Sequence, residues 1–179
     1  MIEGWGMSET CAIGTNNPVN NTTFTGTIGL PLPGIEIAIK DDDGNSLPQG
    51  ASGEICIRGP NVMPGYYNQP EENTKAFTPD GFMRTGDIGI MDAEGYTRII
   101  DRKKDMILVS GFNVFPNEIE NVISTCPGVL ECAAVGIPDE KSGEAVKVFV
   151  VRSDPSLEES DVERFCHENL TGYKRPKSI

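Results

Sequence analysis

The sequence predicts an α+β protein in which a β-rich region precedes a smaller domain of strands and helices. Isoleucines alternate with polar or small residues at 35–39 and 55–57, and the turn-forming stretch DDDGN (41–45) lies between these runs. A period of two is typical of antiparallel strands with one buried face. After residue 104 short apolar runs alternate with segments of helical spacing, which favours a compact α+β arrangement there.

A second hairpin is expected in the β-rich region, because MDAEGY (91–96) separates Ile88 and Ile90 from the alternating run YTRIID (96–101). Two such hairpins predict a small distorted barrel or a curled sheet. The polar stretch at 14–26 has no period and reads as loop, and one helical turn is expected near 71–76.

In the smaller domain, MILVSG (106–111) is read as a strand that contains Gly111, where a bulge or a close approach of backbone or ligand is expected. Pro116 fits the first position of a helix. Two further strands are expected at 129–137 and 144–152, and Ser156 with Glu159 predicts a capping box for a last helix. The apolar residues expected on one face of the first helix are Ile119, Val122, Ile123 and Cys126.

Composition excludes several classes of function. The 179 residues carry a net charge of −12, which argues against general affinity for nucleic acid or an anionic membrane surface, and no apolar run approaches the roughly 18 residues that span a bilayer. The five cysteines form no C-x-x-C pair and are read as small buried residues in a reducing compartment. The single histidine, His167, is expected on a solvated helix surface, so a metal site of His or Cys is not expected.

Four strings of unusual composition stand out along the chain, and the first three each have a chemical interpretation beside a plain one. GWGMSET (4–10) offers an aromatic face between glycines, followed by a hydroxyl and a carboxylate; it also suits a loop with a packed tryptophan. RTGDIG (84–89) places a carboxylate where it can accept from vicinal hydroxyls, although such a string is commonly a turn. DRKKDMILVSGFNVFPNEIE (101–120) gathers three bases that suit phosphate or ribose oxygens or a surface ion cluster. LTGYKRPK (170–177) is the fourth string.

Together these strings resemble consecutive motifs of the acyl-adenylate-forming, or AMP-binding, superfamily. The connecting segments GEICIRGPNVMPGYYNQPE (53–71) and GEAVKVFVV (143–151) resemble bacterial long-chain fatty acyl-CoA ligases. The resemblance covers nearly the whole chain. It implies a fatty acid, ATP with Mg²⁺, and CoA as the ligands of the full-length enzyme.

The resemblance also implies roles for individual residues. Trp5 would lie against adenine, Ser8 would meet phosphate, and Glu9 would bind Mg²⁺ as a catalytic residue. Asp87 would hold the ribose diol, and Arg102 would reach the nucleotide. The family more often has Thr at the position of Ser8, a departure that preserves the hydroxyl.

The other implied roles concern the smaller domain. Lys104 matches the hinge about which this domain swings between two catalytic poses. Ser110, Gly111 and Phe112 match the strand beside the pantetheine tunnel and are candidates for the CoA side, with core structure as the alternative. The implied division is residues 1–103 as the end of the large AMP-binding domain and 104–179 as the mobile C-terminal domain.

We expect the chain to be a C-terminal fragment of the parent enzyme and to be inactive alone. The phosphate-gripping loop is expected upstream of Met1, and the lysine used in adenylation is expected beyond Ile179. The expected location is the cytoplasm, with peripheral association of the parent at the inner membrane left open. Two alternatives stay open: a ligase that adenylates an aryl or amino acid, and a non-enzymatic α+β interaction module.

Overall fold

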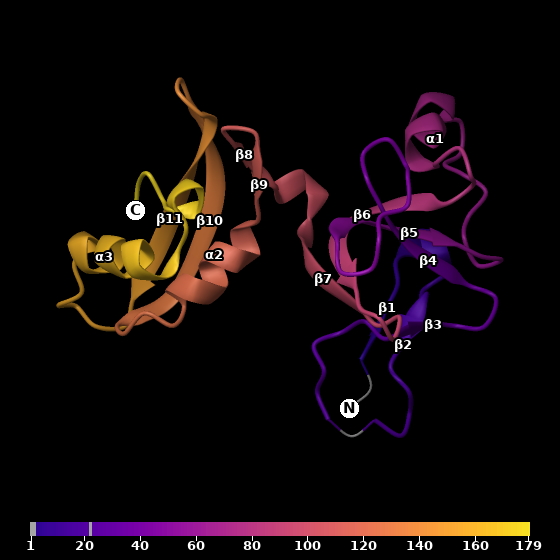
Figure 1. Ribbon diagram of the computed structural model, residues 1–179, viewed down its shortest axis with the longest axis horizontal. Helices are drawn as coiled ribbons and strands as arrows, with labels where there is room; N and C mark the ends of the chain where they lie inside the picture. Colours follow the sequence, from indigo (N-terminus) through magenta and orange to yellow (C-terminus); the bar gives the residue numbers. More distant parts are fainter. Residues whose placement is uncertain (1–2, 22) are drawn as a thin grey trace. The chain divides into compact units, whose positions relative to one another are not determined.

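The computed structural model describes residues 3–21 and 23–179 and contains two compact units, Met1–Lys103 and Lys104–Ile179. Each unit has its own antiparallel sheet (Figure 1). The predicted α+β class, with strands predominating over three helices, is confirmed.

The first unit is built on a four-stranded sheet. Its strands follow one another in chain order: β4 (Glu36–Lys40), β5 (Ser52–Arg58), β6 (Met83–Met91) and β7 (Thr97–Arg102). Ile37 pairs with Ile57 and Ile39 with Ile55, as the alternating isoleucines predict. The sheet is open, because β4 and β7 form its two edges and do not pair with each other in the described part of the chain. The closed barrel is therefore not formed, while the expected helical turn is α1 (Pro70–Ala76).

A second, smaller sheet in this unit was not predicted. It consists of β1 (Gly4–Trp5), β2 (Thr15–Asn16) and β3 (Leu30–Pro31), and the 3-10 helix η1 (Ser8–Thr10) follows β1. Strands of two residues leave no periodicity to detect, which explains the expectation of plain loop. The segment between β1 and β2 requires glycine at position 6, because a Cβ there would lie 1.8 Å from the carbonyl oxygen of Ala12.

The second unit contains a four-stranded sheet covered by helices. Its strand order is β10 (Val129–Asp139), β11 (Gly143–Arg152), β8 (Ile107–Val109) and β9 (Phe112–Val114). Its helices are α2 (Pro116–Ile123), α3 (Glu159–Asn169) and the short 3-10 helix η3 (Gly172–Lys174). Another 3-10 helix, η2 (Lys103–Asp105), includes the last residue of the first unit and the first residues of the second.

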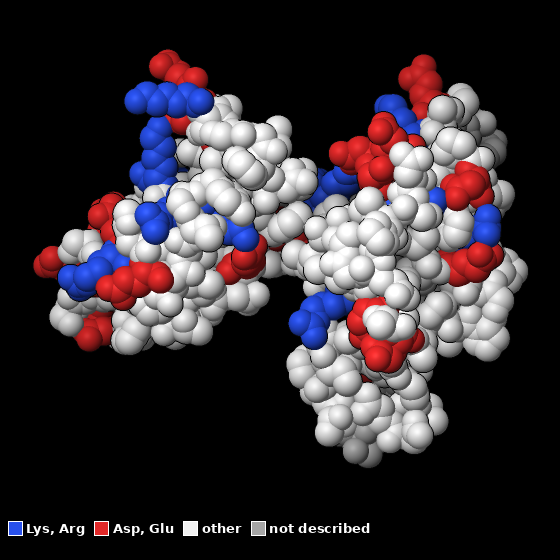
Figure 2. Space-filling view, in the orientation of Figure 1, with Lys and Arg blue, Asp and Glu red and all other residues white. Residues whose placement is uncertain are grey.

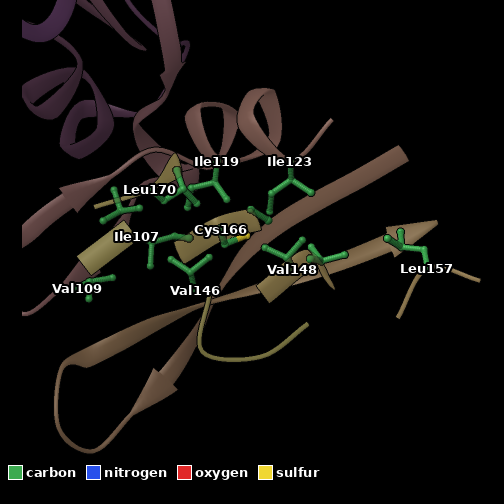
Figure 3. Close-up of a cluster of buried hydrophobic side chains, with 12 residues drawn as sticks. Ile107, Val109, Ile119, Ile123, Val146, Val148, Leu157, Cys166 and Leu170 are labelled. Carbon is green, nitrogen blue, oxygen red and sulfur yellow. The ribbon is translucent and has the colours of Figure 1, made fainter. Parts of the chain in front are cut away.

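One apolar cluster forms the core of this second unit (Figure 3). It joins Ile119 and Ile123 of α2 and Cys166 of α3 to Val146 and Val148 of β11. Both helices thus bury their apolar faces on one side of the sheet, and burying each such side chain contributes about 1.5–3 kcal/mol. The opposite side of β11 leaves Phe149 and Val151 exposed.

Local geometry corrects two expectations about the second unit. Gly111 does not lie within a strand: Ser110 and Gly111, with φ of 52° and 84°, form the tight turn between β8 and β9, and a Cβ at Gly111 would have no neighbour within 4 Å. The last helix is not capped by Ser156, whose hydroxyl donates to Asp154 at 2.8 Å. Glu158 is at the N-cap position instead, and its backbone N–H donates to Oδ2 of Asp161 in the first turn at 3.1 Å.

Three of the five cysteines are buried, as expected, and Cys132 is half-buried. Burial raises the pKa of the Cys56 thiol to about 12 and that of Cys166 to about 11, so neither is ionised near neutral pH. Cys11 is exposed, in a left-handed conformation with φ 51° directly after η1, and the expectation of burial is wrong there.

Acidic and basic side chains are interspersed over the visible face of each unit (Figure 2). None of the helices among the described residues has the length and the apolar character needed to cross a bilayer.

Candidate functional site

Three residues that the sequence analysis singled out come together in the first unit. The indole Nε1 of Trp5 donates to Oδ2 of Asp87 at 2.9 Å, and Nε of Arg102 lies 2.8 Å from Oδ1 of the same carboxylate. Trp5 lies 82 positions before Asp87 along the chain and Arg102 lies 15 positions after it, so the tertiary fold brings the three together. We call this group the Asp87 cluster.

The sheet explains how Asp87 and Arg102 meet. They are direct cross-strand partners in the register of β6 and β7, which places their side chains on the same face. Gly86, with a positive φ of 74°, precedes Asp87. The hydroxyl of Thr85 donates to the carbonyl of Ile55 at 2.7 Å and accepts from the backbone N–H of Asp87 at 3.1 Å, which holds the backbone at this point.

Burial makes the Asp87 carboxylate a well-fixed acceptor. Its side chain is only 5% exposed, whereas that of Arg102 is 59% exposed, so the cluster opens to solvent on the arginine side. A carboxylate has about four lone-pair sites, and the indole and guanidinium occupy two of them. The remaining capacity suits a neutral donor such as a pair of vicinal hydroxyls, and Arg102 offers a cation for a nearby anion.

Ser8 and Glu9 lie on η1 and do not join the Asp87 cluster. Oε1 of Glu9 accepts from the hydroxyl of Tyr66 at 2.9 Å, and the carbonyl of Glu9 accepts from the N–H of Met63 at 2.8 Å. Burial, together with the bond to Glu9, raises the pKa of the Tyr66 phenol. Ser8 is exposed, and its hydroxyl has no partner in the part of the chain that the structure describes.

The Glu9 carboxylate has one oxygen available to bind Mg²⁺. Its second carboxylate oxygen, Oε2, makes no bond to any described residue, and Mg²⁺ is commonly held by one or two carboxylates plus substrate phosphates and water. Within residues 3–21 and 23–179, no group of three or more His, Cys, Asp or Glu side chains surrounds a common point. A single carboxylate oxygen without a described partner fits an ion that is held jointly with a phosphate.

The three bases at 102–104 have three different environments. Arg102 belongs to the Asp87 cluster. Lys103 pairs with Asp42 at 2.7 Å and with the buried Glu54 at 3.0 Å, and these carboxylates raise its pKa against the opposing effect of burial. Lys104 is exposed and has no hydrogen bond or ion pair with any residue that the structure describes.

A surface cavity of about 580 Å³ lies beside this ion-paired region of the first unit. Lys103, Arg84 and Asp42 contribute to its lining. The residues of the Asp87 cluster do not line it, so the cavity and the cluster are separate features.

The candidates for the CoA side lie at the β8–β9 turn of the second unit. Ser110 and Gly111 form the turn itself, and the N–H of Ser110 donates to the carbonyl of Ser142 at 2.8 Å. The ring of Phe112 stacks on that of Tyr173, with centroids 4.7 Å apart and an interplanar angle of 18°. Both rings are partly exposed, so this end of the unit presents a flat aromatic surface.

Four residues with evident roles were not found from the sequence. Tyr66 contacts Glu9, Thr85 fixes the backbone of Asp87, Glu54 binds Lys103, and Tyr173 stacks on Phe112. Each contact joins distant elements, apart from that of Thr85, whose position directly before Gly86 and Asp87 was the one available signal.

Comparison with known families gives two matches along the chain. Residues 1–67 match the family model described as AMP-binding enzyme, and residues 118–179 match the model described as AMP-binding enzyme C-terminal domain. Asp87, Arg102 and Lys104 lie between the two matched segments.

Two solved structures with the same fold are more than 30% identical in sequence to this chain. ATP-bound MatB from Rhodopseudomonas palustris matches all of this chain with 36% of its own, at a TM-score of 0.92 and 40% identity. The o-succinylbenzoate CoA synthetase MenE from Bacillus subtilis, in complex with the acyl-adenylate OSB-AMP, matches 99% of this chain with 37% of its own, at a TM-score of 0.84 and 33% identity. The fold is thus that of the acyl-adenylate-forming class of proteins.

The chain belongs to the AMP-binding enzyme family. It is 52% identical over its full length to the long-chain-fatty-acid–CoA ligase of Escherichia coli O6:H1. The chain spans about a third of the length of the curated relatives it matches, 32% in that case.

Proposed function

We propose that the full-length parent is an AMP-forming long-chain fatty acid–CoA ligase, of which this chain supplies part of the nucleotide site and the mobile C-terminal domain. The observation that carries the proposal is that Trp5 and Arg102 both bind the buried carboxylate of Asp87. The 52% identity to a long-chain-fatty-acid–CoA ligase supports the fatty acid as substrate.

The proposed reaction has two steps. A fatty acid carboxylate oxygen attacks the α-phosphorus of ATP, a new C(O)O–P bond forms, and pyrophosphate leaves, which gives acyl-AMP. The sulfur of CoA then attacks the acyl carbonyl, the bond to AMP breaks, and acyl-CoA and AMP are released while the thiol proton passes to solvent.

Residues of the first unit have positioning and electrostatic roles in this scheme. Asp87 accepts hydrogen bonds from the two ribose hydroxyls and so orients the nucleotide, while Trp5 fixes the carboxylate and offers its ring to the adenine. Arg102 supplies positive charge beside the nucleotide, which stabilises negative charge that develops on the transferring group. Ser8 donates its hydroxyl to phosphate.

Glu9 is the proposed protein ligand of Mg²⁺, through the carboxylate oxygen that Tyr66 leaves unengaged. When bound, the ion neutralises phosphate charge and polarises the phosphoryl oxygens. Tyr66 holds the Glu9 side chain in place.

Lys104 is the proposed hinge between the two half-reactions. Its exposed side chain makes no hydrogen bond or ion pair with a described residue, and a few backbone torsions at such a residue can absorb a large reorientation. Ser110, Gly111 and Phe112 are proposed to contact CoA, since a turn without neighbouring atoms at Gly111 leaves room for a ligand.

The proposal is tested by assaying the full-length protein for AMP release that depends on both a fatty acid and CoA. We expect palmitate to support turnover and benzoate or amino acids to fail. Turnover with an aryl acid alone would favour the alternative ligase, which the fold shared with MenE keeps open. We expect the 179-residue chain alone to form no acyl-CoA from palmitate, ATP and CoA, and any measurable formation would contradict this.

A further inference from the structure

Glu54 on β5 is a buried carboxylate whose two oxygens serve different parts of the first unit. Its side chain is 5% exposed. Oε1 accepts from the backbone N–H of Gly86 at 3.1 Å, whereas Oε2 accepts from Arg84 at 2.9 Å and from Lys103 at 3.0 Å. A buried carboxylate with three donors is a fixed point in the structure, because breaking such a set leaves a desolvated charge unpaired.

The two groups that Glu54 holds lie next to the two functional features of this unit. Gly86 directly precedes Asp87, the centre of the Asp87 cluster. Lys103 directly follows Arg102 and is the last residue of the first compact unit, while Lys104 is the first residue of the second. One carboxylate therefore connects the nucleotide side of the unit to the end of the chain segment that leaves it.

The partners of Lys103 differ in how strongly they can hold it. Asp42 is 87% exposed, so water competes for its interaction with Lys103 and weakens it. Glu54 is buried, so its hydrogen bond with Lys103 is the one that fixes the position of the lysine. A hinge consists of a few residues that absorb large changes of φ and ψ. If Lys103 is held in place, these changes are limited to Lys104 and the residues that follow it.

We propose that Glu54 is a positioning residue that fixes Asp87 through Gly86 and, through Lys103, confines the swing of the C-terminal domain to torsions at Lys104 and beyond. This inference rests on the proposed function. It assigns to Glu54 no contact with substrate. It predicts that releasing Lys103 impairs the change between half-reactions and leaves nucleotide binding intact.

The test uses the full-length enzyme and measures the half-reactions separately. Adenylation is followed by pyrophosphate release in the absence of CoA, and overall turnover by acyl-CoA formation. For Lys103→Met we expect an unchanged KM for ATP and an unchanged adenylation rate, within about twofold, with overall turnover reduced about tenfold or more, as for misplaced reacting groups. Lys103→Arg keeps a cation within reach of Glu54 and should restore most of the turnover.

Two further variants separate the functions of the carboxylate. Glu54→Gln removes the charge that holds both groups, so we expect weaker AMP binding as well as slower turnover. Asp42→Asn removes the exposed partner of Lys103 alone and is the matched control, with both half-reactions within about twofold of wild type. Lys103→Met leaves Glu54 paired with Arg84 and Gly86, so the test stands even where the Glu54 variant fails to fold.

The result that overturns the inference is a folded Lys103→Met enzyme whose half-reactions both match wild type or both fall by the same factor. The proposed function then stands, because the wild-type enzyme still forms acyl-AMP and acyl-CoA. A wild-type enzyme that releases no pyrophosphate with a fatty acid would instead overturn the proposed function itself.

Discussion

Replacing Asp87 with Asn should weaken nucleotide binding far more than it weakens folding. The amide keeps the shape and one acceptor oxygen but removes the charge that the structure pairs with Arg102 at 2.8 Å. Because a hydrogen bond to a charged group contributes about 1 kcal/mol more than a neutral one, two ribose hydroxyls would together lose about 2–3 kcal/mol. That loss corresponds to a roughly 30- to 140-fold higher Kd for AMP.

The cost to stability should be smaller, because Arg102 is 59% exposed and water can solvate it once the carboxylate is neutral. We expect a loss of about 1 kcal/mol or less from this pair. Isothermal titration of AMP into the full-length enzyme measures the first quantity, and urea unfolding of the 179-residue chain measures the second.

The matched control for this substitution is Asp43→Asn, which removes one acidic charge from an exposed turn. It should leave the Kd for AMP unchanged. If folded Asp87→Asn binds AMP within about threefold of wild type, a difference below about 1 kcal/mol, the assignment of Asp87 to the nucleotide is wrong.

Three further predictions concern other parts of the chain. Glu9→Gln should lower the raised pKa of Tyr66, because the bond to the carboxylate contributes to that rise; ultraviolet absorbance titration detects the change. Ile119→Ala should destabilise the second unit by about 2–5 kcal/mol in urea unfolding, since Ile119 is fully buried in its core. Asp80→Asn should flatten the acid side of the stability profile: bonds from Lys40 and Thr78 lower the pKa of Asp80 from 3.8 to about 2, so its contribution is present above pH 3.8 and disappears as the pH falls through 2.

Each of these three predictions has a result that would contradict it. A Tyr66 pKa unaffected by Glu9→Gln would remove Glu9 as its partner, and Tyr66→Phe identifies the signal. Leu130→Ala, at a position 62% exposed, should change stability by about 0.5 kcal/mol or less, and an equal effect at Ile119 would contradict the core assignment. Parallel pH profiles of wild type and Asp80→Asn between pH 2 and 4 would show that Lys40 does not stabilise the ionised carboxylate.

Periodicity predicted the parts of the fold that are long and half-buried. The alternation at Ile37 and Ile39 led to the hairpin of β4 and β5, and the helical spacing of Ile119 and Ile123 led to α2. Val146 and Val148 face the core of the second unit, as their alternation predicts. In these segments the pattern of buried residues matches the period of the backbone, so the local sequence is enough to predict the strand or helix.

Features set by turns and caps were predicted less well. The β8–β9 hairpin was missed because Ser110 adopts a left-handed conformation, which is uncommon for a residue other than glycine. The capping box failed because Ser156 bonds to Asp154, so the helix begins at Glu159 instead. Either choice satisfies local hydrogen-bonding rules, and only the tertiary structure decides between them.

The candidate site shows the same division. Motif resemblance named Trp5, Asp87 and Arg102, and the structure brings these three together. It did not name Tyr66 or Glu54, because their contacts with Glu9 and Lys103 span 57 and 49 residues and leave no local pattern. Contacts of this length come from the sheet register and loop packing.

Hydrogen exchange on the full-length enzyme, with and without AMP, tests the central proposal most directly. We predict that AMP slows exchange together in the segments around Trp5, Asp87 and Arg102, because one bound nucleotide orders all three. The β10–β11 hairpin should serve as an unchanged reference. Exchange that stays the same in all three segments at saturating AMP would contradict the proposed nucleotide site and favour a non-enzymatic interaction module.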